Sequence, residues 1–455
     1  MIKRVIIIVG GRMKTSLLII LNKLITLVCK LFKRDGSVFP ASIVRKIDKN
    51  ILDKIKYPKY VIGVTGSSGK GSTTSMIAHI LEDNGIKTVW NKSGSNVVNG
   101  TTTLILNNTS ILNHKMKCDC LLLEMDESYI SATFKQNVLT HLVITNITRD
   151  QPARNGEPEI IFHKIASSIG DKTHLIINAD DALVNRFTTL PNKVTCYGID
   201  KTKYSLKTPI SHNIDAAYCP ICNSKLNYSF YHYGHLGNYS CPNKDFERHI
   251  DYLGKKLDLD NQSIEINKRC YHLNKDVFFA AYYTLAAYTL CREIGLNEDN
   301  IEHALNVNIL ESKRLKSLNF EGRLVEMIES KNENNLSYLQ SLNYINNYKD
   351  DKTVIIGFDN VSRRYKYNDI SWLYDVDFEV LKLNNNDKIL CIGRFRYDVY
   401  ARLISAGFKE DQIILVDDKN KIKDYLKLTK GTIFTMVCFD MTAILKKIFT
   451  EANND

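Results

Sequence analysis

The sequence predicts an α/β protein in which a central phosphate-loop domain with a parallel sheet carries a cysteine-ribbon insert and precedes a small Rossmann-like α/β domain. Near-continuous apolar segments such as "KYVIGVTG" and "CDCLLLEMDE" alternate with helical patterns, which is typical of parallel strands covered on both faces. A glycine-rich loop follows the first such segment, and a cysteine-containing stretch later interrupts the alternation. These three observations fix the predicted class.

Composition narrows the kind of protein. The 455 residues are 44% apolar and 24% charged, as in an ordinary globular chain with two or three domains. The net charge of +11 is spread along the chain without a basic tract or a nucleic-acid-binding module, so we expect no nucleic-acid partner. Most of the 11 cysteines stand singly in apolar runs, which favours a reducing cytoplasm over a disulfide scaffold.

We expect residues 1–56 to form a helical segment, the N-terminal lead-in, that precedes the first domain. The apolar run "SLLIILNKLITLVCKLF" is interrupted by Asn22, Lys23 and Lys30, so it is not expected to span a bilayer. No small-residue cleavage site follows it, which argues against a signal peptide. We expect this segment to pack against the body of the protein, with binding to a membrane surface as the alternative.

The central domain is expected over residues 57–323 and the C-terminal domain over 324–455. The helical run "KDVFFAAYYTLAAYTLCREIG" closes the central domain after an insert at 197–254. Central strands are expected at 59–66, 87–92, 118–127, 140–148 and 173–181, with a helix at 73–86. C-terminal strands are expected at 353–359, 388–395, 412–418 and 432–439. Ligands of such sheets bind at the carboxyl ends of the strands.

The loop "GVTGSSGKGSTT" lies between a predicted strand and a predicted helix. Gly66 and Gly69 let the backbone wrap so that its N–H groups point at phosphate oxygens, and Lys70 adds a positive charge. Because Gly71 follows the lysine, the hydroxyl expected to hold Mg²⁺ moves to Ser72. The predicted nucleotide-binding residues here are Gly66, Ser67, Ser68, Gly69, Lys70, Gly71, Ser72 and Thr73.

This loop resembles that of the Mur ligase and folylpolyglutamate synthase superfamily, and further motifs follow in the same order. Three of these motifs match superfamily segments. They are "LLLEMDES", which contains Glu124, "TNITRDQPARNGE", in which the matching segment starts at Asn146, and "INADD". The resemblance implies that Glu124 holds Mg²⁺, that Asn274 lies at a helix start used against adenine, and that Arg323 reaches the phosphates of ATP.

Within that superfamily the sequence resembles the MurT family, the synthetase subunits of lipid II isoglutaminyl synthase. The opening "FKRDGSVFPASIVRKIDKNIL", the position of the cysteine insert and the segment "YNDISWLYDVDFE" carry this resemblance. It implies that ATP activates the α-carboxylate of D-glutamate in the lipid II stem peptide as an acyl phosphate, and that ammonia then gives isoglutamine. It also implies a heterodimer with a GatD-type glutamine amidotransferase, and a cytoplasmic location that extends to the inner face of the membrane.

In that family an aspartate of the C-terminal domain completes the partner's Cys-His pair. Asp369 is the first choice because it precedes "ISW" after a polar stretch, and Asp375 is the second. An ordinary helix N-cap is the alternative role for Asp369.

Two rival functions remain open. A folylpolyglutamate synthase shares the Gly71-Ser72 variant but would lack the cysteines and the "DISW" segment. A non-catalytic nucleotide-binding scaffold is favoured by departures from the family pattern, namely Val277, "SKNENNLSY" and the basic loop "DNVSRRYKYND". The presence of Lys70, Glu124 and Arg323 together argues against the scaffold.

The insert contains Cys219, Cys222 and Cys241 in the spacing of a zinc ribbon, but Lys244 stands where a fourth cysteine would complete the site. Structural zinc takes four ligands. One hypothesis is that Zn²⁺ is bound by the three cysteines and by another residue that replaces the fourth cysteine; the other hypothesis is an insert without metal. The candidate substitutes are His249, His235, His232 and Asp245.

Overall fold

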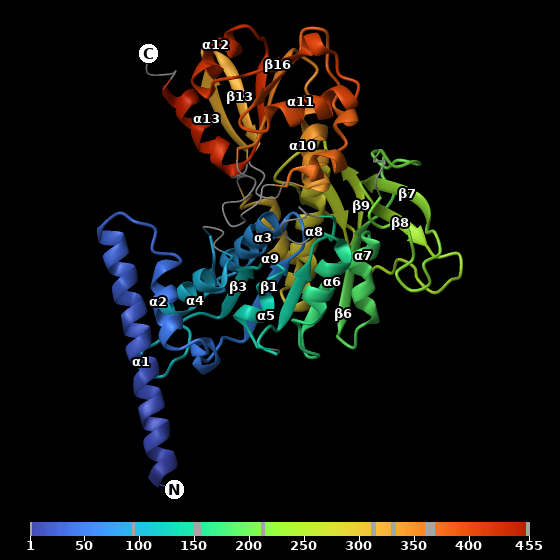
Figure 1. The fold of residues 1–455 in the computed structure, drawn as a ribbon. Helices are drawn as coiled ribbons and strands as arrows, with labels where there is room; N and C mark the ends of the chain where they lie inside the picture. The colour runs from blue at the N-terminus through green and yellow to red at the C-terminus, as the bar shows by residue number, and fades with distance from the viewer. Residues whose placement is uncertain are drawn as a thin grey trace.

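The structure is a computed structural model, and it describes residues 2–92, 96–135, 137–149, 156–210, 214–310, 315–328, 334–359 and 369–451. The family-like segment at 150–155, the start of "SKNENNLSY" and nearly all of the basic loop "DNVSRRYKYND" lie outside these residues. Figure 1 shows a central domain with the C-terminal domain above it, the hairpin of the insert on one side and a long N-terminal helix on the other.

A nine-stranded sheet forms the middle of the central domain in the described part of the chain, in the order β11-β10-β9-β6-β5-β4-β1-β3-β2. From β6 to β2 all neighbours are parallel, as expected for this sheet, and β6 also pairs parallel with β9, whereas the β9–β10 and β10–β11 pairs are antiparallel. Strands β6, β9, β10 and β11 were not predicted, and the expected start of the insert at residue 197 falls inside β6. The strands are β1 (Tyr60–Thr65), β2 (Thr88–Trp90), β3 (Cys120–Glu124), β4 (His141–Ile144), β5 (His174–Asn178), β6 (Val194–Ile199), β9 (Tyr252–Asp258), β10 (Ser263–Ile266) and β11 (Arg269–His272).

Helices cover both faces of this sheet, which is why its strands are apolar along their whole length. In β3, Cys120 and Leu122 join a core shared with α3 and α8, whereas Leu121 and Leu123 join a core shared with α1, α2, α4 and α6. The helices of the domain are α3 (Lys70–Asp83), α4 (Val98–Asn107), α5 (Ile130–Thr133), α6 (Pro158–Ala166), α7 (Ala182–Asn185), α8 (Phe278–Glu293) and α9 (Glu298–Asn306).

The C-terminal domain contains a six-stranded sheet in the described residues, in the order β12-β13-β17-β14-β15-β16. The four expected strands are present, but the hairpin of β12 and β13 adds two more, so the expected boundary at 323/324 falls at the start of β13. The strands are β12 (Leu315–Phe320), β13 (Arg323–Ile328), β14 (Lys352–Gly357), β15 (Lys388–Ile392), β16 (Ile413–Leu415) and β17 (Thr432–Val437); the helices are α10 (Asn335–Asn346), α11 (Arg396–Ser405), α12 (Ile422–Lys427) and α13 (Phe439–Glu451).

The insert leaves the central sheet after β6 and returns at β9, and between them it forms the hairpin of β7 (Asn227–Tyr233) and β8 (Leu236–Ser240). The turn of this hairpin reaches the C-terminal domain, because a Cβ at Gly234 would lie 2.8 Å from a methyl group of Leu336 in α10. The insert therefore contacts both domains.

The N-terminal lead-in folds into α1 (Ile2–Leu31) and α2 (Phe39–Ile47), which pack against each other and against α4. Leu18 and Ile19 of α1 are buried in the core under the sheet, so packing against the body of the protein is confirmed for this part of the helix. None of the described helices has the length and apolar content that a membrane crossing requires.

Candidate functional site

The phosphate loop joins the carboxyl end of β1 to the start of α3, as predicted. Gly66 has φ +128°, and a Cβ there would lie 2.3 Å from the Thr145 hydroxyl, so both conformation and space require glycine. Gly69 has φ +79° but faces open space, and its carbonyl accepts the first helical bond from Thr73 N at 3.0 Å. The loop thus leads its backbone directly into the N-terminus of α3, where anions bind favourably.

The neighbouring strand β4 holds this loop in shape. Just beyond its end, the Asn146 side chain accepts a bond from Ser68 N at 2.9 Å and donates to Ser68 O at 3.1 Å. The Thr145 hydroxyl also donates to Ser68 O at 2.7 Å, and Ser67 N donates to Asn146 O at 2.8 Å. The loop is therefore fixed in place by side chains from the adjacent strand.

Lys70 is buried and ion-paired, and its partner was missed by the sequence analysis. Its ammonium lies 3.0 Å from Glu127 Oε1, with the lysine 4% and the glutamate 2% exposed, and it also donates to the Gly66 carbonyl. Glu127 occurs three residues after Glu124 in "LEMDES", so the acidic character of that segment was its only sequence signal. A buried charge of this kind needs its counter-charge, and Glu127 supplies it.

Glu124 ends β3 beside the phosphate loop, since it is the register partner of Val64 in β1. The Asn91 side chain fixes its backbone, accepting from Glu124 N and donating to Glu124 O, both at 2.9 Å. The half-buried carboxylate is thus carried on a rigid strand end. Carboxylate and hydroxyl oxygens are ligands that Mg²⁺ accepts, so Glu124 and Ser72 fit the role predicted for them.

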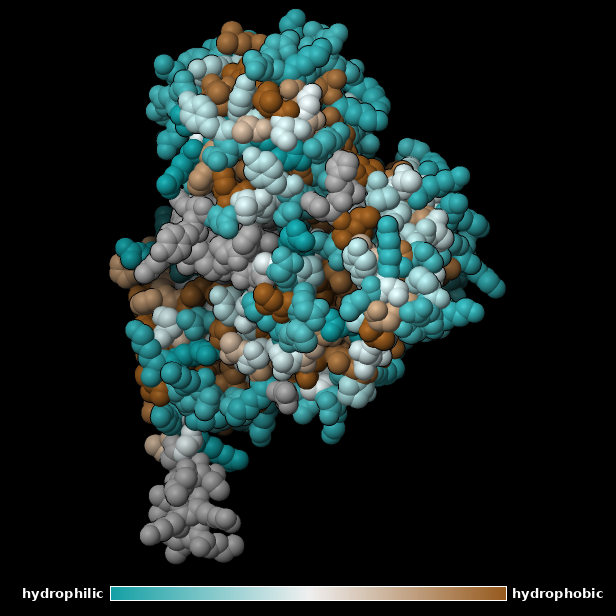
Figure 2. Space-filling model, turned by 45° about the vertical axis from the view of Figure 1, so that its right-hand side comes forward, coloured by the Kyte–Doolittle hydropathy of each residue, from teal (hydrophilic) through white to brown (hydrophobic). Residues whose placement is uncertain are grey.

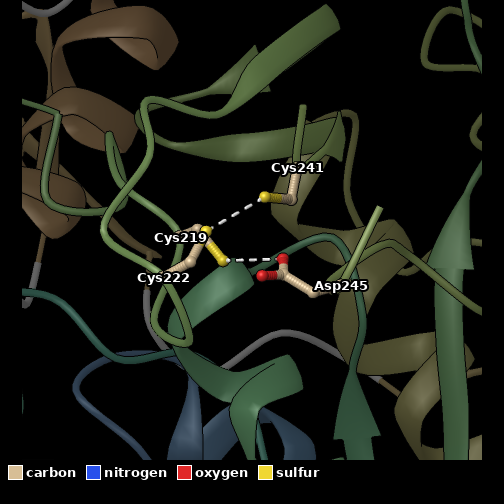
Figure 3. A group of neighbouring side chains, drawn as sticks. All are labelled: Cys219, Cys222, Cys241 and Asp245. Atoms are coloured by element: carbon tan, nitrogen blue, oxygen red, sulfur yellow. Dashed lines mark hydrogen bonds between the residues drawn. The ribbon is translucent and has the colours of Figure 1, made fainter. Parts of the chain in front are cut away.

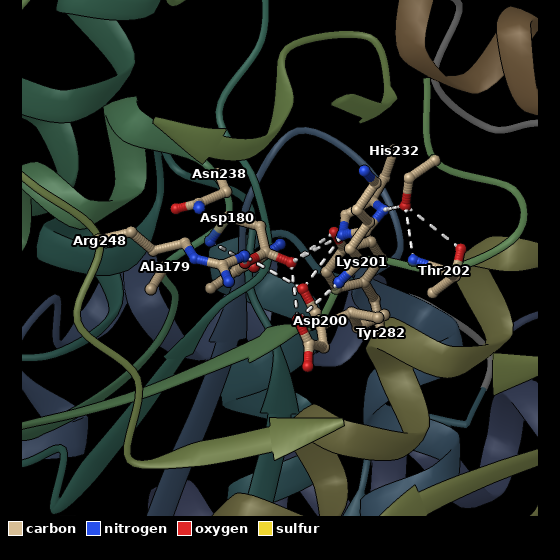
Figure 4. Close-up of polar contacts among 12 residues, drawn as sticks. Ala179, Asp180, Asp200, Lys201, Thr202, His232, Asn238, Arg248 and Tyr282 are labelled. Carbon is tan, nitrogen blue, oxygen red and sulfur yellow. Dashed lines mark hydrogen bonds and ion pairs between the residues drawn. The ribbon is translucent and has the colours of Figure 1, made fainter. Parts of the chain in front are cut away.

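The next strand end, after β5, carries two fully buried aspartates that anchor the insert. Asp180 accepts from Arg248 at 2.5 Å, from the Tyr282 hydroxyl at 2.7 Å and from Ile199 N at 2.8 Å (Figure 4). His232 lies 3.7 Å away, and its Nε2 is 3.1 Å from the Ile199 carbonyl. Burial, the largest influence, lowers the pKa of His232.

Asp181 links three segments. One of its oxygens caps α7 by accepting from Leu183 N at 2.9 Å, and the other accepts from Ile147 N at 2.8 Å. His235 of the insert lies 3.2 Å away, and although burial acts to lower its pKa, Asp181 raises it above the ordinary value. The "INADD" element therefore connects the loop after β4 to the insert.

Arg149 connects the central domain to the C-terminal domain. Its guanidinium lies 3.3 Å from Asp375 and within 4 Å of Asp215 and Glu157. Asp215 also accepts from the Thr148 hydroxyl at 2.5 Å and from Arg149 N at 2.8 Å. Burial is the main cause of a raised pKa at Asp375, and Arg149 opposes it.

The two aspartates considered for the partner's site differ in surroundings. Asp375 ends the short 3₁₀ helix Ser371–Asp375 and is engaged by Arg149. Asp369 is half-buried and accepts a bond from Ser371 N at 2.9 Å, but the N-cap residue of the following helix is Ile370, so Asp369 is not the helix N-cap named as its alternative role. A partner histidine would meet a carboxylate at Asp369 that has no cation bonded to it among the described residues.

Two other predicted residues are bonded to groups outside the phosphate loop. All three guanidinium nitrogens of Arg323 are engaged within the C-terminal domain, donating to the carbonyls of Gly431 and Leu426 and to the Thr353 hydroxyl at 2.7–3.0 Å. A phosphate contact by Arg323 would require these bonds to be exchanged. Asn274 lies before α8 and accepts from the Tyr283 hydroxyl. Their nucleotide roles stay predictions.

The three insert cysteines meet at one point, together with Asp245 (Figure 3). The ligand atoms of Cys219, Cys222, Cys241 and Asp245 all lie within 4.8 Å of one another, whereas ligands around a tetrahedral Zn²⁺ stand about 3.8 Å apart. The backbone N–H groups of Ile221 and Asn243 each donate to a cysteine sulfur at 3.4 Å, which stabilises thiolate charge. The arrangement fits zinc.

The structure decides among the four candidate substitutes by position. His249 is 78% exposed beside Asp251, and the other two histidines lie against the buried aspartates. Lys244 takes φ +60° and its side chain is exposed. Because of the turn at Lys244, the side chain that faces the cysteines is that of the next residue, Asp245, and not that of Lys244 itself.

Comparison with known proteins agrees with this geometry. The Mur ligase middle domain matches residues 64–243, and the MurT ligase C-terminal domain matches 331–442. A pseudomurein peptide ligase type C from Methanothermus fervidus superposes with TM-score 0.63 at 19% identity, covering 88% of this chain and 81% of that one. MurF from Acinetobacter baumannii gives TM-score 0.60 at 13% identity, with 91% and 80% covered.

The fold and the phosphate loop define a ligase of the Mur type. The chain is 27% identical to the lipid II isoglutaminyl synthase (glutamine-hydrolyzing) subunit MurT of Staphylococcus aureus over 412 residues, covering 90% of this chain and 91% of that protein. The corresponding subunit of Streptococcus pneumoniae is 25% identical, with 83% and 84% covered. Within the Mur-type ligases, the chain carries the MurT ligase C-terminal domain and is similar to MurT subunits along most of its length.

Proposed function

We propose that this chain is the synthetase subunit that amidates the α-carboxylate of D-glutamate in the lipid II stem peptide. The observation that carries the proposal is the match to MurT subunits along nine-tenths of the chain, combined with a phosphate loop whose lysine is buried and oriented. We place the activity in the cytoplasm at the inner face of the membrane, because the substrate is carried on a lipid.

The proposed reaction has two steps. A carboxylate oxygen attacks the γ-phosphorus of ATP, which forms an acyl phosphate and releases ADP. Ammonia then attacks the carbonyl carbon, the C–O bond to phosphate breaks, and an amide and inorganic phosphate remain after loss of a proton. Ammonia would come from a GatD-type glutaminase subunit that this chain binds.

The residues of this chain supply positioning and charge. The backbone N–H groups of residues 69–72 would cradle the phosphates, because those of Ser67, Ser68 and Thr73 are already bonded within the protein, and Lys70 would neutralise the charge that develops on the transferred group. When bound, Mg²⁺ supplies further charge stabilisation at the phosphates, and Ser72 and Glu124 are the residues proposed to hold it. Glu127 keeps the Lys70 ammonium beside the loop.

The test is reconstitution with the glutaminase subunit, ATP, glutamine and lipid II, followed by mass analysis of the stem peptide. We expect conversion of a carboxylate to an amide, its loss in Lys70→Met, and its retention in the control Lys92→Met, whose side chain is 68% exposed. ATP binding without amidation would instead favour the scaffold. Glutamylation of tetrahydrofolate would favour the folylpolyglutamate synthase alternative.

For the partner's site we propose Asp369, because Asp375 is already bonded to Arg149. Asp369→Asn should abolish amidation from glutamine but preserve amidation from free ammonium, since only the glutaminase histidine loses its partner. Asp375→Asn is the comparison variant. If it, and not Asp369→Asn, shows this selective loss, the assignment is reversed.

We also propose that the insert binds one structural Zn²⁺ through its three cysteines and Asp245. Metal analysis of the purified chain should give one zinc per chain, and Cys219→Ser should remove it. Asp245→Ala should lose zinc to a competing chelator sooner than the control Asp260→Ala, whose side chain is 82% exposed. Equal zinc retention by these two aspartate variants would contradict the role of Asp245.

A further inference from the structure

Helix α1 has one face fixed to the protein. Leu18, Ile19 and Asn22 are buried, and the Asn22 amide donates to Asn107 of α4 at 2.9 Å. Lys23 also donates to the Thr109 carbonyl at 2.7 Å. These contacts set the rotation of the helix about its axis, so its opposite face is held in a defined direction.

That opposite face is apolar and exposed. Residues spaced three or four apart fall on one side of a helix, and here they form a stripe from residue 13 to residue 31 whose side chains are 49–72% exposed. The members of this α1 stripe are Met13, Leu17, Leu24, Leu27, Val28 and Leu31. Hydrophobic side chains gather along the same edge of the molecule in Figure 2, above the grey terminal residues.

Two exposed aromatic side chains follow the stripe along the chain, one just after α1 and one at the start of α2. Phe32 is 74% exposed and Phe39, at the start of α2, is 55% exposed. Aromatic rings at the edge of an apolar surface suit the boundary between lipid headgroups and acyl chains. The apolar surface therefore extends over the whole described length of α1 beyond residue 12.

Every charged side chain in this segment is cationic. Residues 1–34 contain eight lysines and arginines and no aspartate or glutamate. On the helical wheel, Arg12 and Lys30 lie along one border of the stripe and Lys14 lies along the other, and all three are exposed. Cations bordering an apolar stripe match a surface that combines acyl chains with negative headgroups.

We propose that the α1 stripe docks this protein on an anionic lipid bilayer, with α1 lying in the plane of the headgroups. A second copy of the chain is a poorer occupant, because a symmetric contact would bring two sets of cations together. The inference rests on the chemistry of α1 and not on the proposed reaction. A bilayer-bound protein would meet lipid-carried substrates without diffusing from solution.

The experiment is vesicle co-sedimentation of the full chain, without nucleotide or substrate, on phosphatidylglycerol-containing and on pure phosphatidylcholine vesicles. We expect binding to the anionic vesicles that weakens with added salt. The triple variant Leu17→Glu, Leu24→Glu, Leu31→Glu should bind about tenfold or more weakly. A matched triple variant at exposed apolar positions elsewhere, Val307→Glu, Tyr397→Glu and Leu428→Glu, should bind as the parent does; these side chains are 70%, 56% and 73% exposed.

A charge variant separates the two parts of the surface. Arg12→Gln, Lys14→Gln and Lys30→Gln together should lower binding to the anionic vesicles and leave the apolar stripe intact. Equal binding of the parent to both kinds of vesicle, or equal binding of the two Glu triple variants, would overturn the proposal. So would a parent dimer that the α1 Glu variant converts to monomer, because the stripe would then be covered by a second copy.

Discussion

The buried pair of Lys70 and Glu127 gives a quantitative prediction about the phosphate loop. The two charged atoms are 3.0 Å apart, and both side chains are at most 4% exposed. Replacing the lysine by methionine removes the ammonium that faces a buried carboxylate, which costs about 3–5 kcal/mol of unfolding free energy. Replacing the glutamate by glutamine as well removes the carboxylate charge.

The assay is a double-mutant cycle on unfolding free energy, measured by denaturant unfolding of the parent, Lys70→Met, Glu127→Gln and the double variant. We expect the double variant to be more stable than the sum of the single losses predicts, with a coupling of about 1.5–3 kcal/mol. The control pair is Lys256 and Glu265, which are 2.8 Å apart but 77% and 24% exposed.

The control cycle should give a much smaller coupling, because water screens an exposed pair. Additivity within about 0.5 kcal/mol at Lys70 and Glu127 would refute the reasoning. It would mean that Glu127 does not hold the lysine of the phosphate loop in the folded protein.

Three further outcomes follow from the geometry. Gly66→Ala should lose about 2–3 kcal/mol of stability and all ATP binding, whereas Gly69→Ala should lose about 1 kcal/mol because its Cβ meets open space; equal losses by calorimetry would contradict this. Arg248→Met should lose about 3–5 kcal/mol by stranding its buried carboxylate partner, and Arg248→Lys should recover part of this loss in thermal unfolding. Because Asp181 raises the pKa of His235, the stability it contributes is complete below about pH 6.5 and declines as pH rises. As pH rises above about 6.5, the parent should therefore lose melting temperature more steeply than His235→Gln, and parallel curves would refute the assignment.

Much of the fold was predictable because the parallel strands are buried on both faces. β1, β3, β4 and β5 are uninterrupted apolar runs that end in polar residues, and α3 ends before Gly85, whose φ is +70°. Two of the strands that were missed have mixed sequences: β9 contains Lys255 and Lys256, and β12 contains Lys316 and Asn319. Such strands at or near a sheet edge owe their structure to partners in the sheet and not to a local pattern.

The candidate site, like the fold, has features that the sequence predicts and features that only the tertiary structure shows. By itself the sequence determined the phosphate loop, the order of the strand-end motifs and the three cysteines, because each depends on residues close together in the chain. Only the tertiary structure decided that Glu127 pairs with Lys70, that Asp245 joins the cysteines, that Arg149 reaches Asp375, and that α1 turns an apolar stripe to solvent. Each of these depends on which side chains meet across separate elements, or on which face of a helix finds no partner, and local sequence carries no record of either.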